Sequence, residues 1–248
     1  MTGAVICEKK DGVAHLVLNR PQAGNAINEQ LAQELAEACQ QVNQDERVVV
    51  VIISGAGSAF CVGSDLEPVR ALSLVTPAQA VASVDKPVIA AINGEAIGPG
   101  LELALSCDLR ITSDEARFGL PQLSQGFIPW DGGSQRLPRI VGRARALELL
   151  LTSRTIDVVE ALRIGLVNKV VPAKALLPES QALARQLAAK GPIALRYAKE
   201  AVNKGLDLTL EQGLRLEADL YFLLHTTADR IEGVRAFLEK RPPRFRGA

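Results

Sequence analysis

The chain has 248 residues, enough for one or two domains with a large buried core. Its 28 Lys and Arg residues balance 28 Asp and Glu residues, so the charge provides no basic field for nucleic acid or anionic lipid, and neither is an expected partner. No apolar run reaches the ~18 residues of a membrane span, and the N-terminus lacks the basic start of a signal peptide, so we expect a cytoplasmic protein.

The first half of the chain alternates strands with helices. In chain order, the sequence predicts a strand at 13–19, a helix at 29–42, strands at 48–53 and 88–93, a helix at 101–107 and a strand at 108–112. The helices show apolar residues at three- and four-residue steps. The β-branched runs at 48–53 and 88–93 are typical of parallel strands covered on both faces. This order indicates an α/β fold.

The second half of the chain is mainly helical. Helices are predicted at 143–151, 158–164, 177–189, 193–204, 208–225 and 228–239. Turn residues such as Gly191 and Pro192 separate them. We therefore expect an α/β core at 1–190 and a helical region at 191–248.

The cysteines and histidines form no metal-binding pattern. Four cysteines lie far apart without a Cys-x-x-Cys pair, and the two histidines lack paired spacing; they are Cys7, Cys39, Cys61, Cys107, His15 and His225. Reduced thiols and no metal site are expected.

Glycine-containing turns follow the predicted strands at 54–58, 94–100 and 126–133. None contains the Gly-Lys-Ser or Gly-Lys-Thr of a phosphate-binding P-loop, and the turn at 98–100 lacks the third glycine of a dinucleotide site. Such turns present backbone N–H groups at helix starts, which suits the stabilisation of a developing oxyanion.

Six motifs occur along the chain, at residues 60–66, 86–94, 100–108, 118–121, 132–139 and 232–240. In this order they resemble the motifs of the enoyl-CoA hydratase/isomerase (crotonase) superfamily. The resemblance covers nearly the whole chain and implies a crotonase-like spiral of ββα units with a helical C-terminal trimerisation region. It also implies an acyl-CoA thioester substrate, a homotrimer or hexamer, and no cofactor apart from the coenzyme A carried by the substrate.

The resemblance assigns the oxyanion donors and the hydratase carboxylates. The donors correspond to the N–H groups of Ser64 and of Pro99, but proline has no N–H. Either the Gly100 N–H replaces it through a rotated turn, or the oxyanion chemistry is lost. Glu102 matches the first carboxylate, whereas Gln122 stands at the second and cannot carry a proton.

The turn at 128–133 also departs from the family pattern. It contains Asp131 and the only tryptophan, Trp130, near the expected acyl pocket. Dienoyl-CoA isomerases and the aryl-CoA dehalogenase, two other types of the superfamily, resemble this chain in placing a catalytic Asp in or near that turn. We therefore expect Glu102 and Asp131 to be the proton-transfer pair, with a turn-forming role for Asp131 as the alternative. The residues expected to bind substrate are Cys61, Asp65, Leu66, Gln122 and Trp130.

The segment 67–85 is short for the family, which suggests either an open pocket for a bulky or cyclic acyl group or an incomplete site. The function expected first is hydration of an unsaturated acyl-CoA. The alternatives are an enoyl- or dienoyl-CoA isomerase, a dienoyl-CoA hydratase, and a noncatalytic acyl-CoA-binding protein.

Overall fold

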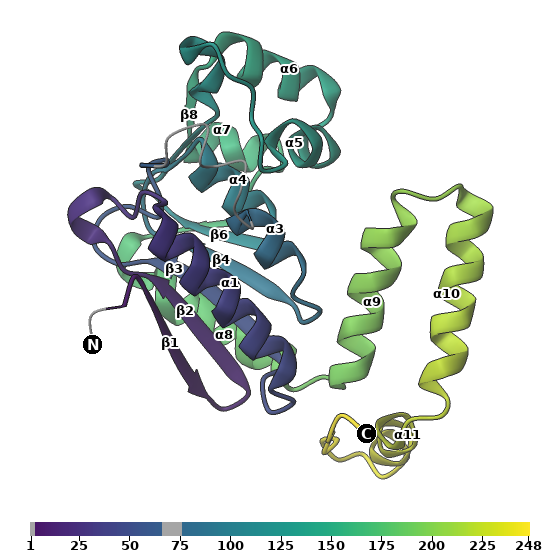
Figure 1. Cartoon of the computed structure of the whole chain (residues 1–248). Coiled ribbons are helices and arrows are strands. Elements are labelled where there is room, and N and C mark those ends of the chain that lie inside the picture. The colour runs from purple at the N-terminus through teal and green to yellow at the C-terminus, as the bar shows by residue number, and fades with distance from the viewer. Residues whose placement is uncertain (1–2, 66–75) are drawn as a thin grey trace.

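The computed structural model describes residues 3–65 and 76–248 (Figure 1). A six-stranded sheet has the order β1-β2-β3-β4-β6-β9. Its strands are β1 (Val5–Lys10), β2 (Val13–Leu18), β3 (Val50–Gly55), β4 (Val88–Ile92), β6 (Leu109–Ser113) and β9 (Lys169–Val171). β1 pairs antiparallel with β2, and every later pair in this sheet is parallel.

A second, three-stranded sheet has the order β5-β7-β8. Its strands are β5 (Ala96–Ile97), β7 (Arg117–Gly119) and β8 (Thr155–Asp157). β5 runs parallel to β7, and β7 antiparallel to β8. This sheet carries the segments from which the site described below is built.

Helices cover both faces of the large sheet (Figure 1). The core helices are α1 (Glu29–Gln44), α3 (Pro77–Ala82), α4 (Pro99–Leu105), α5 (Gly133–Val141), α6 (Arg143–Thr152), α7 (Val158–Arg163) and α8 (Leu176–Ala188), with 3-10 turns η1 (Pro21–Ala23), η2 (Pro121–Gln125) and η3 (Ala173–Ala175). Successive residues of β3 face opposite sides: Ile53 lies in the core that includes α1, and Ile52 lies in the core that includes α8. The run at 48–53 therefore contains a strand buried on both faces, as predicted, although the strand begins at Val50 and extends to Gly55.

Three helices form an arm that extends away from the core (Figure 1). They are α9 (Pro192–Gly205), α10 (Leu210–Leu224) and α11 (Ala228–Leu238). The Lys199 ammonium on α9 ties the arm to the core, since it donates to Asp108 Oδ2 at 2.7 Å and to the Lys86 carbonyl at 2.9 Å. The predicted division at 190/191 falls in the turn between α8 and α9.

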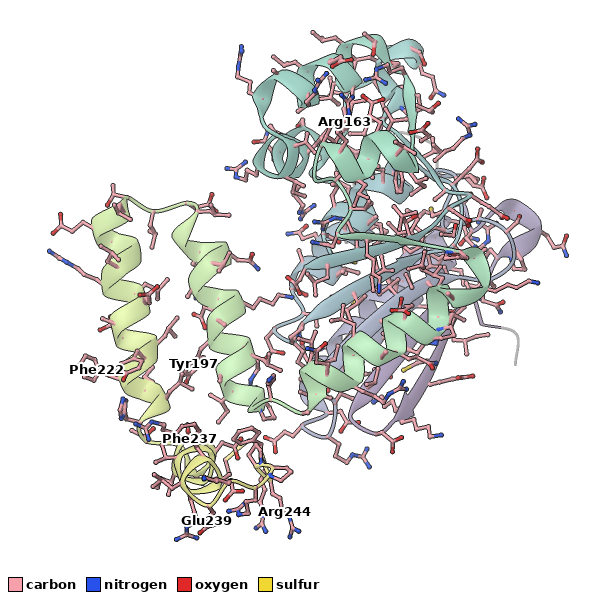
Figure 2. All side chains as sticks on the ribbon, turned by 180° about the vertical axis from the view of Figure 1, so that it is seen from behind. Arg163, Tyr197, Phe222, Phe237, Glu239 and Arg244 are labelled. Carbon is pink, nitrogen blue, oxygen red and sulfur yellow. The ribbon has the colours of Figure 1, made fainter. Side chains whose placement is uncertain are left out.

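The arm exposes many large apolar side chains. Figure 2 shows Phe222 and Phe237 on it, away from the α/β core. Phe237 is 83% exposed and Phe222 is 69% exposed. No helix in the described part of the chain is both long and apolar enough to cross a membrane.

Sequence analysis missed two helices, α3 and α5, and five strands, β1, β5, β7, β8 and β9. Four of these strands have only two or three residues. β1 has exposed residues along most of its length, and α3 has only six residues, too few for a periodic signal. α5 begins at a glycine and contains Pro138, both of which oppose a helical prediction. Four of the missed elements, β5, β7, α3 and α5, carry or border the candidate active site.

Candidate active site

Pairing of β5 with β7 brings together the two segments that carry Glu102 and Gln122. The Gly98 N–H donates to the Gly119 carbonyl at 2.8 Å, which fixes the start of α4 beside the end of β7. Glu102 lies in the first turn of α4, and Gln122 lies in η2 directly after β7. Asp131 lies in the turn that precedes α5.

The Glu102 carboxylate is fully buried and accepts three hydrogen bonds. Its Oε1 accepts from the backbone N–H groups of Asp131 and Gly133, each at 2.8 Å. Its Oε2 accepts from Gln122 Nε2 at 3.1 Å. Burial raises the pKa of Glu102 to about 7, against the lowering effect of the two N–H donors. A carboxyl group that titrates near neutral pH suits general acid–base chemistry.

Gly133 makes this arrangement possible and was not identified from the sequence. A Cβ at this position would lie 3.0 Å from Glu102 Cγ, 3.0 Å from Glu102 Oε1 and 2.9 Å from the Pro129 Cβ. The backbone can therefore approach the carboxylate only because residue 133 has no side chain. The Gly-Gly pair before a helix was the available sequence signal.

Gln122 carries an unpaired acceptor in the site. Gln122 is only 9% exposed, and its side-chain Oε1 is buried without a hydrogen-bond partner among the described residues. Buried polar atoms are normally paired. A water molecule or a ligand hydroxyl that donates to this oxygen would satisfy it.

The Asp131 carboxylate turns toward the N-terminus of α3. Its Oδ2 accepts from the Ala78 N–H at 2.8 Å, and the Thr76 hydroxyl and the Gln79 N–H lie close enough to lower its pKa. Burial raises the pKa of Asp131, while these donors and the charge of Arg136 lower it. Asp131 reaches Glu102 through its backbone N–H, so the contacts favour an anchoring role over the expected proton-transfer role.

Pro99 is the first residue of α4, and Gly100 is the second. First-turn N–H groups have no acceptor within a helix, and the Gly100 N–H has none elsewhere in residues 3–65 and 76–248. The Cys61 carbonyl packs directly against Gly100, because an added Cβ would lie 2.0 Å from that oxygen. Ser64 lies three residues after Cys61 in the chain and forms an isolated parallel β-bridge with Ile27. The start of α4 thus lies beside the segment that leads to Ser64.

The other expected binding residues differ in their surroundings. Cys61 is fully buried, its Sγ–H donates to the Gly63 carbonyl at 3.4 Å, and burial raises its pKa to about 12, so the thiol stays protonated. Asp65 Oδ2 accepts from Arg20 at 2.9 Å. Trp130 is half-buried in the turn before α5. Leu66 lies outside the described residues.

Two exposed apolar residues near this turn were not identified from the sequence. Phe127 is 49% exposed and Ile128 is 71% exposed. Their succession after Gly126, in a stretch predicted to be a turn, was the available signal. An apolar acyl chain or a neighbouring subunit would find contact area there.

Comparison with known proteins decides the family. A family model described as enoyl-CoA hydratase/isomerase matches residues 8–248. The chain belongs to the enoyl-CoA hydratase/isomerase family. It is 41% identical over 249 residues to a probable enoyl-CoA hydratase of Mycobacterium bovis, with 97% of each chain covered. It is also 41% identical over 252 residues to a crotonyl-CoA hydratase of Syntrophomonas wolfei, again with 97% of each covered.

Solved structures confirm the predicted fold. The crystal structure of an enoyl-CoA hydratase from Bacillus anthracis is 38% identical and superposes with a TM-score of 0.96, covering 99% of this chain and 100% of the other. An enoyl-CoA hydratase structure from Geobacillus kaustophilus is 39% identical with a TM-score of 0.93, covering 99% of this chain and 98% of that one. The protein is therefore an enzyme of the enoyl-CoA hydratase/isomerase type, with the crotonase fold.

Proposed function

We propose that this enzyme adds water to an α,β-unsaturated acyl-CoA thioester and that Glu102 alone carries the proton. The buried Glu102 carboxyl, with its pKa near 7, is the observation that carries this proposal. It accepts hydrogen bonds from two backbone N–H groups, which hold it in place. The neighbouring Gln122 amide has no titrating proton, and the Asp131 carboxylate bonds to α3.

The proposed reaction begins with a water molecule between Glu102 and Gln122. Glu102 Oε2 accepts one of its protons, and the unpaired Gln122 Oε1 accepts the other as a hydrogen bond. The water oxygen forms a bond to the β-carbon as Glu102 takes the proton. The π electrons of the C=C bond move to the thioester oxygen, which becomes an enolate.

The second step returns the proton. Glu102 delivers it to the α-carbon, the thioester carbonyl re-forms, and Glu102 is again ionised. The N–H groups of Ser64 and Gly100 would stabilise the enolate oxygen between the two steps, since aimed donors stabilise charge that develops in the transition state. The open first-turn N–H of Gly100 supports its assignment in place of Pro99.

A panel of linear, aromatic and alicyclic enoyl- and dienoyl-CoA substrates tests this function. A product heavier by one water indicates hydration. A change in absorbance without a change in mass would instead indicate an isomerase, and bound but unaltered thioesters would contradict both. The same panel tests the proposed preference for a bulky or cyclic acyl group, which rests on the short segment 67–85, of which residues 67–75 lie outside the described part of the chain.

We further propose that the arm assembles the protein into a homotrimer or a hexamer. Phe222 and Phe237 are exposed on α10 and α11 (Figure 2), and contact with a second and third copy would bury these apolar side chains. Sedimentation should give a trimer or hexamer. Replacing both residues with serine should give smaller species with unchanged core helicity. A wild-type monomer would contradict the proposal.

A further inference from the structure

The backbone N–H, the backbone carbonyl and the side-chain carboxylate of Asp131 each form a hydrogen bond with a different partner. Its N–H donates to Glu102 Oε1 at 2.8 Å, and its carbonyl accepts from Arg136 Nη1 at 2.7 Å. Its carboxylate accepts from the Ala78 N–H at 2.8 Å. One residue therefore joins the Glu102 carboxylate, α5 and α3.

The turn 129–133 is held on its inner side by the burial of Pro129 and by the Gly133 N–H bond to Glu102, but the chain that leads into it is exposed. Residues 124–128, which lead into it, are exposed. Gly132, which follows Asp131, has a φ of 100° and provides no side-chain cap for α5. α3, in contrast, is held firmly: Ala78 and Val81 are fully buried, and the helix packs against α1 and α4. The hydrogen bond from α3 to Asp131 therefore ties the turn to a helix that packs against α4, which carries Glu102.

We propose that Asp131 is a positioning residue: its carboxylate anchors the turn 129–133 to α3 and thereby aims the N–H groups of Asp131 and Gly133 at Glu102. The inference rests on the proposed role of Glu102 and adds the means by which that carboxylate is held. The donors around the Asp131 carboxylate are a hydroxyl and backbone N–H groups. They require an acceptor oxygen and no proton transfer.

An amide oxygen meets that requirement, so two substitutions separate anchoring from chemistry. Asp131→Asn keeps an acceptor, and Asn and Asp are about equally good partners for helix N-terminal N–H groups; its kcat should stay within about threefold of wild type. Asp131→Ala removes the acceptor, and a displaced catalytic group costs roughly 10²-fold in kcat. A proton-transfer role would instead lower kcat in both variants by roughly 10²-fold or more.

Asp157→Ala is the matched control. Asp157 also accepts an N–H at the start of a six-residue helix, α7, from Glu160 at 2.9 Å, and makes no contact with Glu102. This variant should lose some thermal stability and keep the wild-type kcat. If it loses as much activity as Asp131→Ala, the effect at Asp131 is general destabilisation and the inference is wrong.

The pH profile provides a readout that a purely structural role would not move. Among the described residues, Asp131 and Arg136 are the charged groups that face Glu102. Ionised Glu102 is the base, so kcat/KM rises with pH through the pKa of Glu102. Both Asp131 variants lose the same negative charge, but only Asp131→Ala loosens the two N–H bonds that lower this pKa. Its acid limb should therefore lie at higher pH than that of Asp131→Asn. Coincident limbs would overturn the inference.

Amide hydrogen exchange separates this inference from the proposed function. If the wild-type enzyme hydrates none of the thioesters tested, the proposed function fails, but the anchor is still measurable. Peptides that contain Ala78 and Gly133 should exchange faster in Asp131→Ala than in wild type or Asp131→Asn. Equal exchange in all three proteins would overturn the anchor, whatever the activity.

Discussion

Replacing Gly133 with alanine tests whether the backbone of the turn holds Glu102. The new Cβ would lie 2.9 Å from the Pro129 Cβ and 3.0 Å from Glu102 Cγ and Oε1. These contacts are too close, so either the turn or the carboxylate must move, and the 2.8 Å bond from the Gly133 N–H is weakened or lost. A hydrogen bond to a charged group contributes about 1.5–3 kcal/mol, which corresponds to about a 10- to 150-fold fall in turnover.

The pH profile should change in a defined direction. The Gly133 N–H lowers the pKa of Glu102, so its loss raises that pKa above its value of about 7. Because the ionised carboxylate is the base in the proposed mechanism, the acid limb of kcat/KM should move to higher pH. The assay is the hydration rate of crotonyl-CoA across pH, followed by the loss of absorbance of the conjugated thioester.

Gly205→Ala is the control for this substitution. Gly205 is also a helical glycine, at the end of α9, and an added Cβ there would have no atom within 4 Å. Alanine is favoured over glycine in helices by about 1 kcal/mol, so neither variant should unfold because of helix propensity. The loss of a hydrogen bond to a charged group should lower turnover by more than about twofold. If Gly133→Ala stays within that twofold range of wild type and its acid limb is unchanged, the reasoning is refuted.

Three further predictions concern the oxyanion donors, the missing carboxylate and the cofactor. Pro99→Gly should leave turnover equal or lower and reduce the melting temperature, because the proposed mechanism already uses the Gly100 N–H as donor; a clear rise in kcat would show that the missing donor limits the reaction. Gln122→Glu places a second carboxyl beside Glu102 and should raise crotonyl-CoA hydration by about tenfold or more; a fall would show that the site depends on the amide. Dialysis against EDTA should leave kcat unchanged, since every proposed step uses protein groups; loss of activity restored by a divalent cation would contradict this.

The sequence predicted the strands of the sheet centre and most of the helices because their patterns are long and regular. The apolar run that became β4 and the three-to-four spacing of α1 each extend through the element, and the structure confirms both. The segments that sequence analysis missed are short or contain residues that oppose helix formation, as in α3 and α5. Their conformation depends on tertiary contacts, which local patterns do not encode.

The candidate site was predictable in its residues but not in its contacts. The motif around Glu102 identified a carboxylate, and the structure places it with Gln122 and the backbone of Asp131. The direction of the Asp131 carboxylate depends on α3, which is more than 50 residues away in the chain, and no local pattern reveals it. Gly133 donates its N–H to Glu102, and it has no side chain that would keep the backbone away from that carboxylate. A glycine at position 133 does not by itself reveal that its partner is Glu102.

Turnover by Glu102→Gln tests most directly the claim that one carboxyl group moves the proton. Glutamine keeps nearly the same size and an acceptor oxygen for the N–H groups of Asp131 and Gly133, but it cannot titrate. With the best thioester from the substrate panel, kcat should fall by roughly 10²-fold or more while KM stays within a few-fold of wild type. A Glu102→Gln enzyme that still adds water at a rate close to that of wild type would contradict the account.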